Sequence, residues 1–218
     1  MQPQSSVWLS TLEDFDRQIT KGDAVTGAVA VAAVCAACAV SVLRMVLEIS
    51  SRKKDSEGHA ERLRQLLDAA KIEAGHLRQA ADDDRAAYAA YLEASRLPRG
   101  SESERAERHR AMQTALAHAT EVPLGAVRSA VQAMELCAEA AEFVRGEVAA
   151  DVGGAAALLN GAVQAILNSV DANLLRMDDG KFASQKRDLE ERTGHFAELV
   201  RVRLRTTAQT EKGGRPLL

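Results

Sequence analysis

The residues with the clearest chemical potential share one face of a predicted helix. Asp84, Tyr88 and Tyr91 follow one another at intervals of four and three residues, so their side chains point the same way on a helix. A carboxylate beside aromatic rings can stabilise a flat cation and can move a proton. The alternative is that Asp84 is one of three solvated aspartates, which run from Asp82 to Asp84. Both interpretations fit the spacing.

Other polar residues stand out from their surroundings. Asp151 lies at the predicted start of a helix, where its carboxylate could act on a ligand or merely cap the helix. Lys53 and Lys54 form a basic turn that would attract an anionic group, although such turns are usually just solvated. Asn173 is an amide in an apolar stretch. If buried, it must hydrogen-bond a ligand edge or a neighbouring helix.

Metal, redox and nucleic-acid chemistry have little support in the sequence. The five histidines are scattered over charged predicted faces without metal-ligand spacing, so we expect no metal. Cys35 and Cys38 have a redox spacing but lie inside an apolar helix; with Cys137 they are expected to be buried thiols in a reducing cytoplasm. A net charge of -3 and 3% aromatic residues argue against nucleic-acid binding.

The elements that position these residues are all expected to be helices. Alanine is abundant, only four prolines occur, and no apolar/polar alternation bounded by turns is present. We therefore expect an all-α, up-and-down bundle of about seven helices with long Ala-rich central helices. The expected helices cover residues 8–19, 23–50, 56–95, 102–120, 123–145 and 151–175, and a last helix runs from the break at 178–180 to about 205.

One segment resembles a membrane span in length. Residues 24–43 carry no charge and approach the length that a bilayer requires. About half of them are Ala, Gly, Ser or Thr, and Leu occurs once, so the segment is only weakly hydrophobic. We expect a core helix, partly buried in a subunit interface, and no membrane association.

Five different short motifs follow one another between Met45 and Leu174. They are Arg52 to Ser56, Asp84 to Tyr88 leading to Leu97-Pro98-Arg99, Ala119 to Leu124, Ala150 to Gly153, and Asn173-Leu174. In this order and spacing the chain resembles the cyclodeaminase/cyclohydrolase family, which includes methenyltetrahydrofolate cyclohydrolases and the cyclodeaminase half of formiminotransferase-cyclodeaminase.

The resemblance implies a cytoplasmic, all-helical homodimer that binds a tetrahydrofolate derivative in composite sites where helices meet. It places a single helical domain over residues 1–205 and leaves 206–218 as a tail that we expect to be disordered. Asp84 and Asp151 would act on charge and protons. The residues expected to contact the ligand are Lys53, Lys54, Tyr88, Asn173, Glu121, Gly27 and Glu48.

The sequence also departs from the family pattern. The family's Thr-Pro-Gly-Gly-Gly run reads Val25 to Val29 here and keeps only Gly27, so Ala28 and Val29 would narrow the approach of a ligand to backbone N–H groups. Glu48 replaces an Asn, Asp55 a Lys and Ala150 a Ser.

These departures leave several functions open. Hydrolysis of a methenyl bridge is the main expectation, because no transferase half is present. The alternatives are formimino cyclodeamination, one-carbon transfer to another molecule, and a non-catalytic helical binding or assembly paralogue.

Geometry limits how these residues can combine. Asp151 and Asn173 would lie about 33 Å apart on one straight helix. Either Gly153-Gly154 breaks the helix, or the two residues serve different sites, or a second subunit brings one of them into place.

Overall fold

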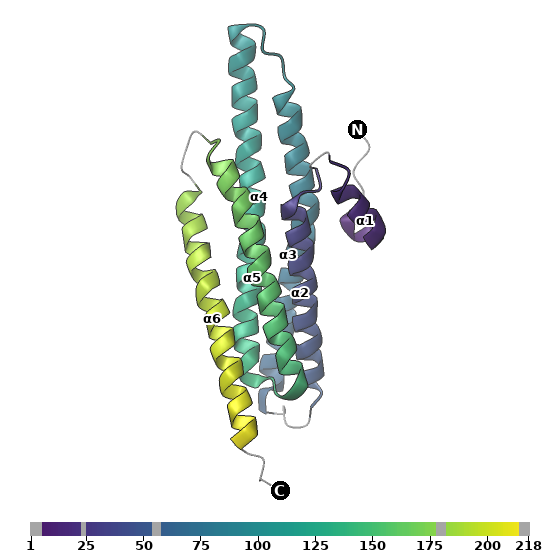
Figure 1. Ribbon diagram of the computed structural model, residues 1–218, viewed down its shortest axis with the longest axis vertical. Coiled ribbons are helices and arrows are strands. Elements are labelled where there is room, and N and C mark those ends of the chain that lie inside the picture. The colour runs from purple at the N-terminus through teal and green to yellow at the C-terminus, as the bar shows by residue number, and fades with distance from the viewer. Residues whose placement is uncertain (1–5, 23–24, 54–57, 178–181, 214–218) are drawn as a thin grey trace.

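The protein is a bundle of long helices lying side by side (Figure 1). The computed structural model describes residues 6–22, 25–53, 58–177 and 182–213, with side chains up to residue 207. Within these ranges the chain forms six α-helices and no strand. They are α1 (Leu12–Ile19), α2 (Ala28–Ser51), α3 (Ala60–Ser95), α4 (Glu102–Phe143), α5 (Ala149–Leu174) and α6 (Ala183–Gly213). The all-α bundle is confirmed, but the expected number of helices is not.

The difference in number comes from α4, which continues through Pro123 instead of ending before it. A proline has no N–H, so the carbonyl of the residue four positions earlier loses its helical donor. That residue is Ala119, and the side-chain amide of Asn173 donates to its carbonyl oxygen at 2.9 Å. A side chain from α5 thus replaces the missing backbone bond. The start of α4 is as predicted, because Ser101 and Glu104 form a capping box.

The core of the bundle is built from small side chains. α2 packs against α3 and α5, and α4 packs against α3, α5 and α6. Ala33, Ala36 and Val40 of α2 are fully buried, and such small residues let helix axes approach closely. Two helical segments, Ala28–Ser51 and Gly146–Leu174, are long and apolar enough to cross a membrane, but about half of each hydrophobic window is buried inside the bundle.

One side of α2 remains uncovered in the single chain. Cys35 and Cys38 are exposed there, so the expectation that all three thiols are buried is correct only for Cys137. Burial raises the pKa of the Cys137 thiol to about 12. The buried side of α2 packs against α3 and α5, and Cys35 and Cys38 are not part of that buried side.

The first expected helix is also interrupted. A 3-10 turn, η1 (Val7–Leu9), precedes α1, and the Thr11 side chain caps α1. The Trp8 indole N–H donates to the Arg78 carbonyl at 2.9 Å, which ties η1 to α3. Leu9 and Leu12 do not join Trp8 on a buried face, since they are 84% and 85% exposed. Asp23, the first residue of the next expected helix, lies outside the described residues.

The last helix extends further than expected. α6 does not end near Arg205 but runs to Gly213. Thr207 is buried and donates to the Ala141 carbonyl at 3.4 Å, and Arg203 donates to the Ala138 carbonyl at 2.7 Å. These contacts with α4 hold residues in the helix that were expected to form a disordered tail.

Candidate functional site

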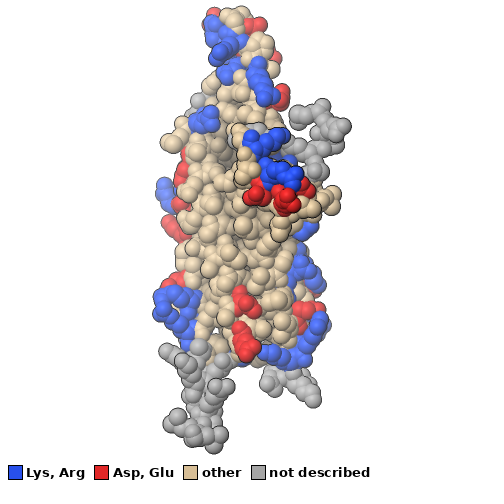
Figure 2. Space-filling view, turned by 45° about the vertical axis from the view of Figure 1, so that its right-hand side comes forward, with Lys and Arg blue, Asp and Glu red and all other residues tan. Residues whose placement is uncertain are grey.

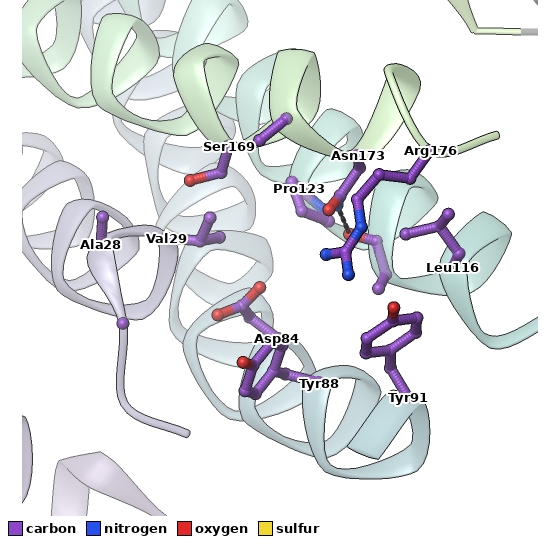
Figure 3. A pocket seen from close by; sticks show the side chains of 13 residues that line it. Ala28, Val29, Asp84, Tyr88, Tyr91, Leu116, Pro123, Ser169, Asn173 and Arg176 are labelled. Carbon is purple, nitrogen blue, oxygen red and sulfur yellow. Dashed lines mark hydrogen bonds between the residues drawn. The ribbon is translucent and has the colours of Figure 1, made fainter. Parts of the chain in front are cut away.

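A cavity of about 240 Å³ lies where four helices meet (Figure 3). The start of α2, the later part of α3, the middle of α4 and the end of α5 each supply part of its wall. The lining residues are Gly27, Ala28, Val29, Asp84, Tyr88, Tyr91, Leu116, Ala119, Pro123, Ser169, Ala172, Asn173 and Arg176. Of the residues predicted from sequence, Gly27, Asp84, Tyr88 and Asn173 are brought together here.

Asp84 is the acid of the cavity. It accepts a hydrogen bond from the backbone N–H of Ala30 in the first turn of α2. Gly27, the N-cap of α2, makes no side-chain capping bond, so Asp84 provides this interaction from α3. Desolvation by burial raises the pKa of the Asp84 carboxyl to about 6, and the hydrogen bond from Ala30 opposes this shift. An acid with such a pKa can change protonation state near neutral pH.

The three consecutive aspartates have different surroundings. Asp82 accepts the backbone N–H of Val7 at 2.9 Å, and Asp83 accepts the side-chain amide of Gln79 at 2.8 Å. Only Asp84 lines the cavity. The alternative of three equivalent solvated aspartates is therefore wrong for Asp84.

Two tyrosines form an aromatic wall next to Asp84. The rings of Tyr88 and Tyr91 stack with their centroids 6.4 Å apart and their planes at 29°. Tyr91 is buried, and Figure 3 shows its hydroxyl directed toward the cavity. This surface can pack against a flat ring, as the helical spacing predicts.

Asn173 and Ser169 provide polar atoms from α5. The amide nitrogen of Asn173 is engaged with Ala119, while the residue still lines the cavity. The contact with a neighbouring helix is therefore observed, because the amide supports α4. The residue also lines the cavity, where its oxygen can accept a hydrogen bond. Ser169 lies one turn earlier on the same face and also lines the cavity.

The residues that replace the glycine run narrow the cavity without closing it. Val29 is buried and forms part of the wall, next to Ala28. At about 240 Å³ the cavity is below the roughly 300–1,000 Å³ typical of pockets for small molecules. A small ligand could enter it, and a larger one would project outside.

The other predicted residues lie elsewhere. Asp151 is exposed in the first turn of α5, and because α5 is unbroken through Gly153 and Gly154, it is about 33 Å along the helix from Asn173. Lys53 follows the end of α2 and donates to the Arg145 carbonyl at 3.3 Å.

Two further predicted residues are also separate from the cavity. Glu48 pairs with Arg52 at 3.1 Å near the same end of α2 as Lys53, and Glu121 is exposed on α4 outside the cavity lining. Lys54 lies outside the described residues. Within one chain, Lys53, Glu48 and Asp151 thus belong to the opposite end of the bundle from Asp84.

Sequence reasoning missed two polar residues that line the cavity, Ser169 and Arg176. Both are at helical intervals from Asn173, four residues before it and three after it. Extending the face of Asn173 along its helix would have found them, as the same spacing did for Asp84, Tyr88 and Tyr91. In the part of the chain that the structure describes, no group of three or more His, Cys, Asp or Glu side chains could hold a metal ion.

The chain resembles known proteins both in its fold and in its sequence. The fold matches the crystal structure of formiminotetrahydrofolate cyclodeaminase from Thermotoga maritima with a TM-score of 0.82 and 23% identity, covering 92% of this chain and 98% of the other. This likeness establishes the fold. No curated protein sequence matches. The family described as formiminotransferase-cyclodeaminase matches residues 11–191, and the chain belongs to this family.

Proposed function

We propose that the protein is a folate-dependent one-carbon enzyme of the cyclodeaminase type. It would bind a formimino derivative of tetrahydrofolate, close the methenyl bridge between the two folate nitrogens and release ammonia. The family and the T. maritima structure both carry the cyclodeaminase name, which favours this reaction over the methenyl hydrolysis expected from sequence. The observation that carries the proposal is Asp84, a half-buried acid with a pKa of about 6 in a cavity with an aromatic wall.

The reaction needs one group that moves a proton twice. The N10 nitrogen attacks the carbon of the protonated formimino group, and the proton displaced from N10 passes to the Asp84 carboxylate. Asp84 then returns this proton to the amino group, the carbon–nitrogen bond breaks, and ammonia leaves. The methenyl bridge that remains is a cation, which the ionised carboxylate stabilises. A pKa near 6 suits both steps, because neither the acid nor its carboxylate is too weak for the transfer.

The remaining cavity residues would bind the ring system. Tyr88 offers a surface for stacking, and the Asn173 oxygen and Ser169 hydroxyl can hydrogen-bond its polar edge. The size of the cavity suits the bicyclic head, so the tail of the folate would extend beyond it. Val29 would set the depth to which the head can enter.

We also propose that the chain acts as a homodimer. α2 carries no charged residue from Ala28 to Leu43, and α5 carries none from Val152 to Val170. The middle of the face that they share is largely uncharged, with charged side chains toward its ends (Figure 2). Exposed residues on this face include Cys35, Cys38 and Met45 of α2 and Gly154, Leu158 and Gly161 of α5.

A second subunit would also explain the residues at the far end of the bundle. Because Asp151, Lys53 and Glu48 cannot reach the Asp84 cavity of their own chain, the corresponding residues of a partner would complete a composite site. The exposed free thiols on the shared face suit a reducing cytoplasm, which we propose as the location.

One set of measurements tests the reaction. Tetrahydrofolate binding is followed by calorimetry, and turnover of formimino-tetrahydrofolate by the appearance of methenyl absorbance together with ammonia. Hydrolysis of the methenyl compound without cyclodeamination would contradict the proposal and support a cyclohydrolase. Binding without either reaction would indicate one-carbon transfer to another molecule. If the wild-type protein does not bind tetrahydrofolate, the remaining interpretation is a non-catalytic helical binding or assembly paralogue.

A further inference from the structure

Arg176 lies at the mouth of the cavity with its backbone held on both sides. Its N–H donates to the Asn173 carbonyl at 2.9 Å, and its own carbonyl accepts the side-chain amide of Gln113 at 3.1 Å. The first bond continues the end of α5, and the second joins that end to α4. The position of this residue is therefore fixed, although its side chain is exposed.

The guanidinium group is directed over the aromatic wall. Its central carbon is 5.2 Å from the centroid of the Tyr91 ring, and Figure 3 shows the side chain extending into the space above Tyr91. None of the salt bridges among the described residues includes Arg176. A guanidinium stacked on a ring keeps its N–H groups available for a bidentate contact with a carboxylate.

Charge therefore changes sign between the interior of the cavity and its mouth. The Asp84 carboxylate is largely buried against the first turn of α2, whereas Arg176 is exposed at the end of α5. A ligand that satisfies both groups has a cationic part inside and an anionic part outside. Lys53 of the same chain cannot take the outer role, because it follows the far end of α2, a helix about 36 Å long.

We infer that Arg176 is a specificity-determining residue, which selects folates by binding a carboxylate of their glutamate tail. The inference rests on the proposed folate function. It adds a direction of binding, with the ring system at Asp84 and the tail leaving past Tyr91 and Arg176. It also assigns a tail contact to the chain that holds the ring, whose own Lys53 is too far away.

The test compares two ligands that differ only in the charge of the tail. Calorimetry gives the Kd of tetrahydrofolate and of its diamide, in which both tail carboxylates are carboxamides. The wild-type protein should prefer tetrahydrofolate by about tenfold, the effect of one charge-assisted contact at an exposed site. Arg176→Gln should abolish this preference by weakening tetrahydrofolate binding while leaving the diamide unchanged. Arg176→Lys should retain part of it.

Arg128→Gln is the matched control. Arg128 is also exposed but lines a different groove between α3 and α4, together with Glu73 and His76, so this variant should keep the wild-type preference. If the wild type binds both ligands equally, or if Arg176→Gln keeps the preference, the inference is wrong while the folate function stands. If neither ligand binds the wild type, the folate function itself is wrong.

Discussion

At the scale of single residues, burial and a hydrogen bond act in opposite directions on Asp84. Burial is the larger effect and raises its pKa to about 6, while the Ala30 N–H favours the ionised form. Because cyclodeamination begins with the carboxylate accepting a proton, kcat/KM should rise with pH through about 6 and then level off. This is measured as methenyl formation between about pH 5 and 8.

Asp84→Asn keeps the shape and an oxygen that can accept the Ala30 N–H, but it cannot carry a proton. We expect kcat to fall by about 100-fold or more, in the range attributed to general acid–base catalysis, with the rise near pH 6 lost. Circular dichroism and thermal unfolding should show that the variant is folded. A variant that retains activity within a few fold of the wild type would remove Asp84 from the mechanism.

The same pKa predicts a pH-dependent cost in stability. In the folded protein the pKa of Asp84 is raised from 3.8 to about 6, so ionisation favours the unfolded chain. The contribution of Asp84 to stability is therefore highest below about pH 4, is lost as the pH rises to about 6, and stays absent above it. Two pKa units correspond to about 3 kcal/mol.

Asp84→Asn removes this penalty. The variant should gain up to about 3 kcal/mol in free energy of unfolding relative to the wild type near pH 8, and the gain should become small near pH 4. Urea titrations of both proteins at the two pH values measure it. A difference between the two proteins that does not change with pH would show that Asp84 is not desolvated.

The spacing along α3 was sufficient to predict that Asp84, Tyr88 and Tyr91 share a face, because one helix fixes their relative directions. The sequence could not show that Asp84 approaches the first turn of α2, since that contact depends on how two helices pack. For the same reason, the location of Asp151 and Lys53 at the opposite end became clear only from the helix ends in three dimensions.

At the scale of helices, the link between Asn173 and Pro123 yields a prediction about stability. Asn173→Ala would leave the Ala119 carbonyl without its donor, which should cost about 1–3 kcal/mol in free energy of unfolding. Pro123→Ala restores a backbone N–H that can donate to the same carbonyl. In the Pro123→Ala background, Asn173→Ala should therefore cost clearly less.

A double-mutant cycle measured by urea unfolding gives the coupling between the two positions. Thr114→Ala is a control, because it removes a helical side-chain bond to the Arg110 carbonyl on the same α4 and does not involve Pro123. Equal costs of Asn173→Ala in both backgrounds would mean that the amide does not replace the missing bond.

The bounds of a helix were predicted well where they depend on neighbouring residues, and poorly where they depend on contacts with another helix. The start of α4 was visible locally, because the capping box lies within four consecutive residues. The passage of α4 through Pro123 was not, since the donor that permits it is 54 residues away on α5. The extension of α6 beyond Arg205 likewise depends on contacts with α4 that no local pattern in the last helix reports.

At the scale of the whole molecule, the uncharged face of α2 and α5 is the surface where we propose that two copies of the chain meet. The all-α class and the Ala-rich central helices were predictable from composition, because small side chains and few prolines favour long, closely packed helices. Composition does not indicate which side of a helix remains uncovered. The structure places exposed Cys35, Cys38 and Met45 beside the small residues of α5.

Two exposed glycines offer a matched test of this surface. Gly161 lies on the uncharged face of α5 and Gly194 on α6, and a Cβ added at either meets nothing within 4 Å, so Arg at each should fold. The wild type should sediment as a dimer, Gly161→Arg as a monomer, and Gly194→Arg as a dimer. If the site is composite, the Gly161→Arg monomer should also lose cyclodeaminase activity while its thermal unfolding remains cooperative. A monomeric wild type with full activity would show that the Asp84 cavity works alone, and that Asp151 and Lys53 have no part in the reaction.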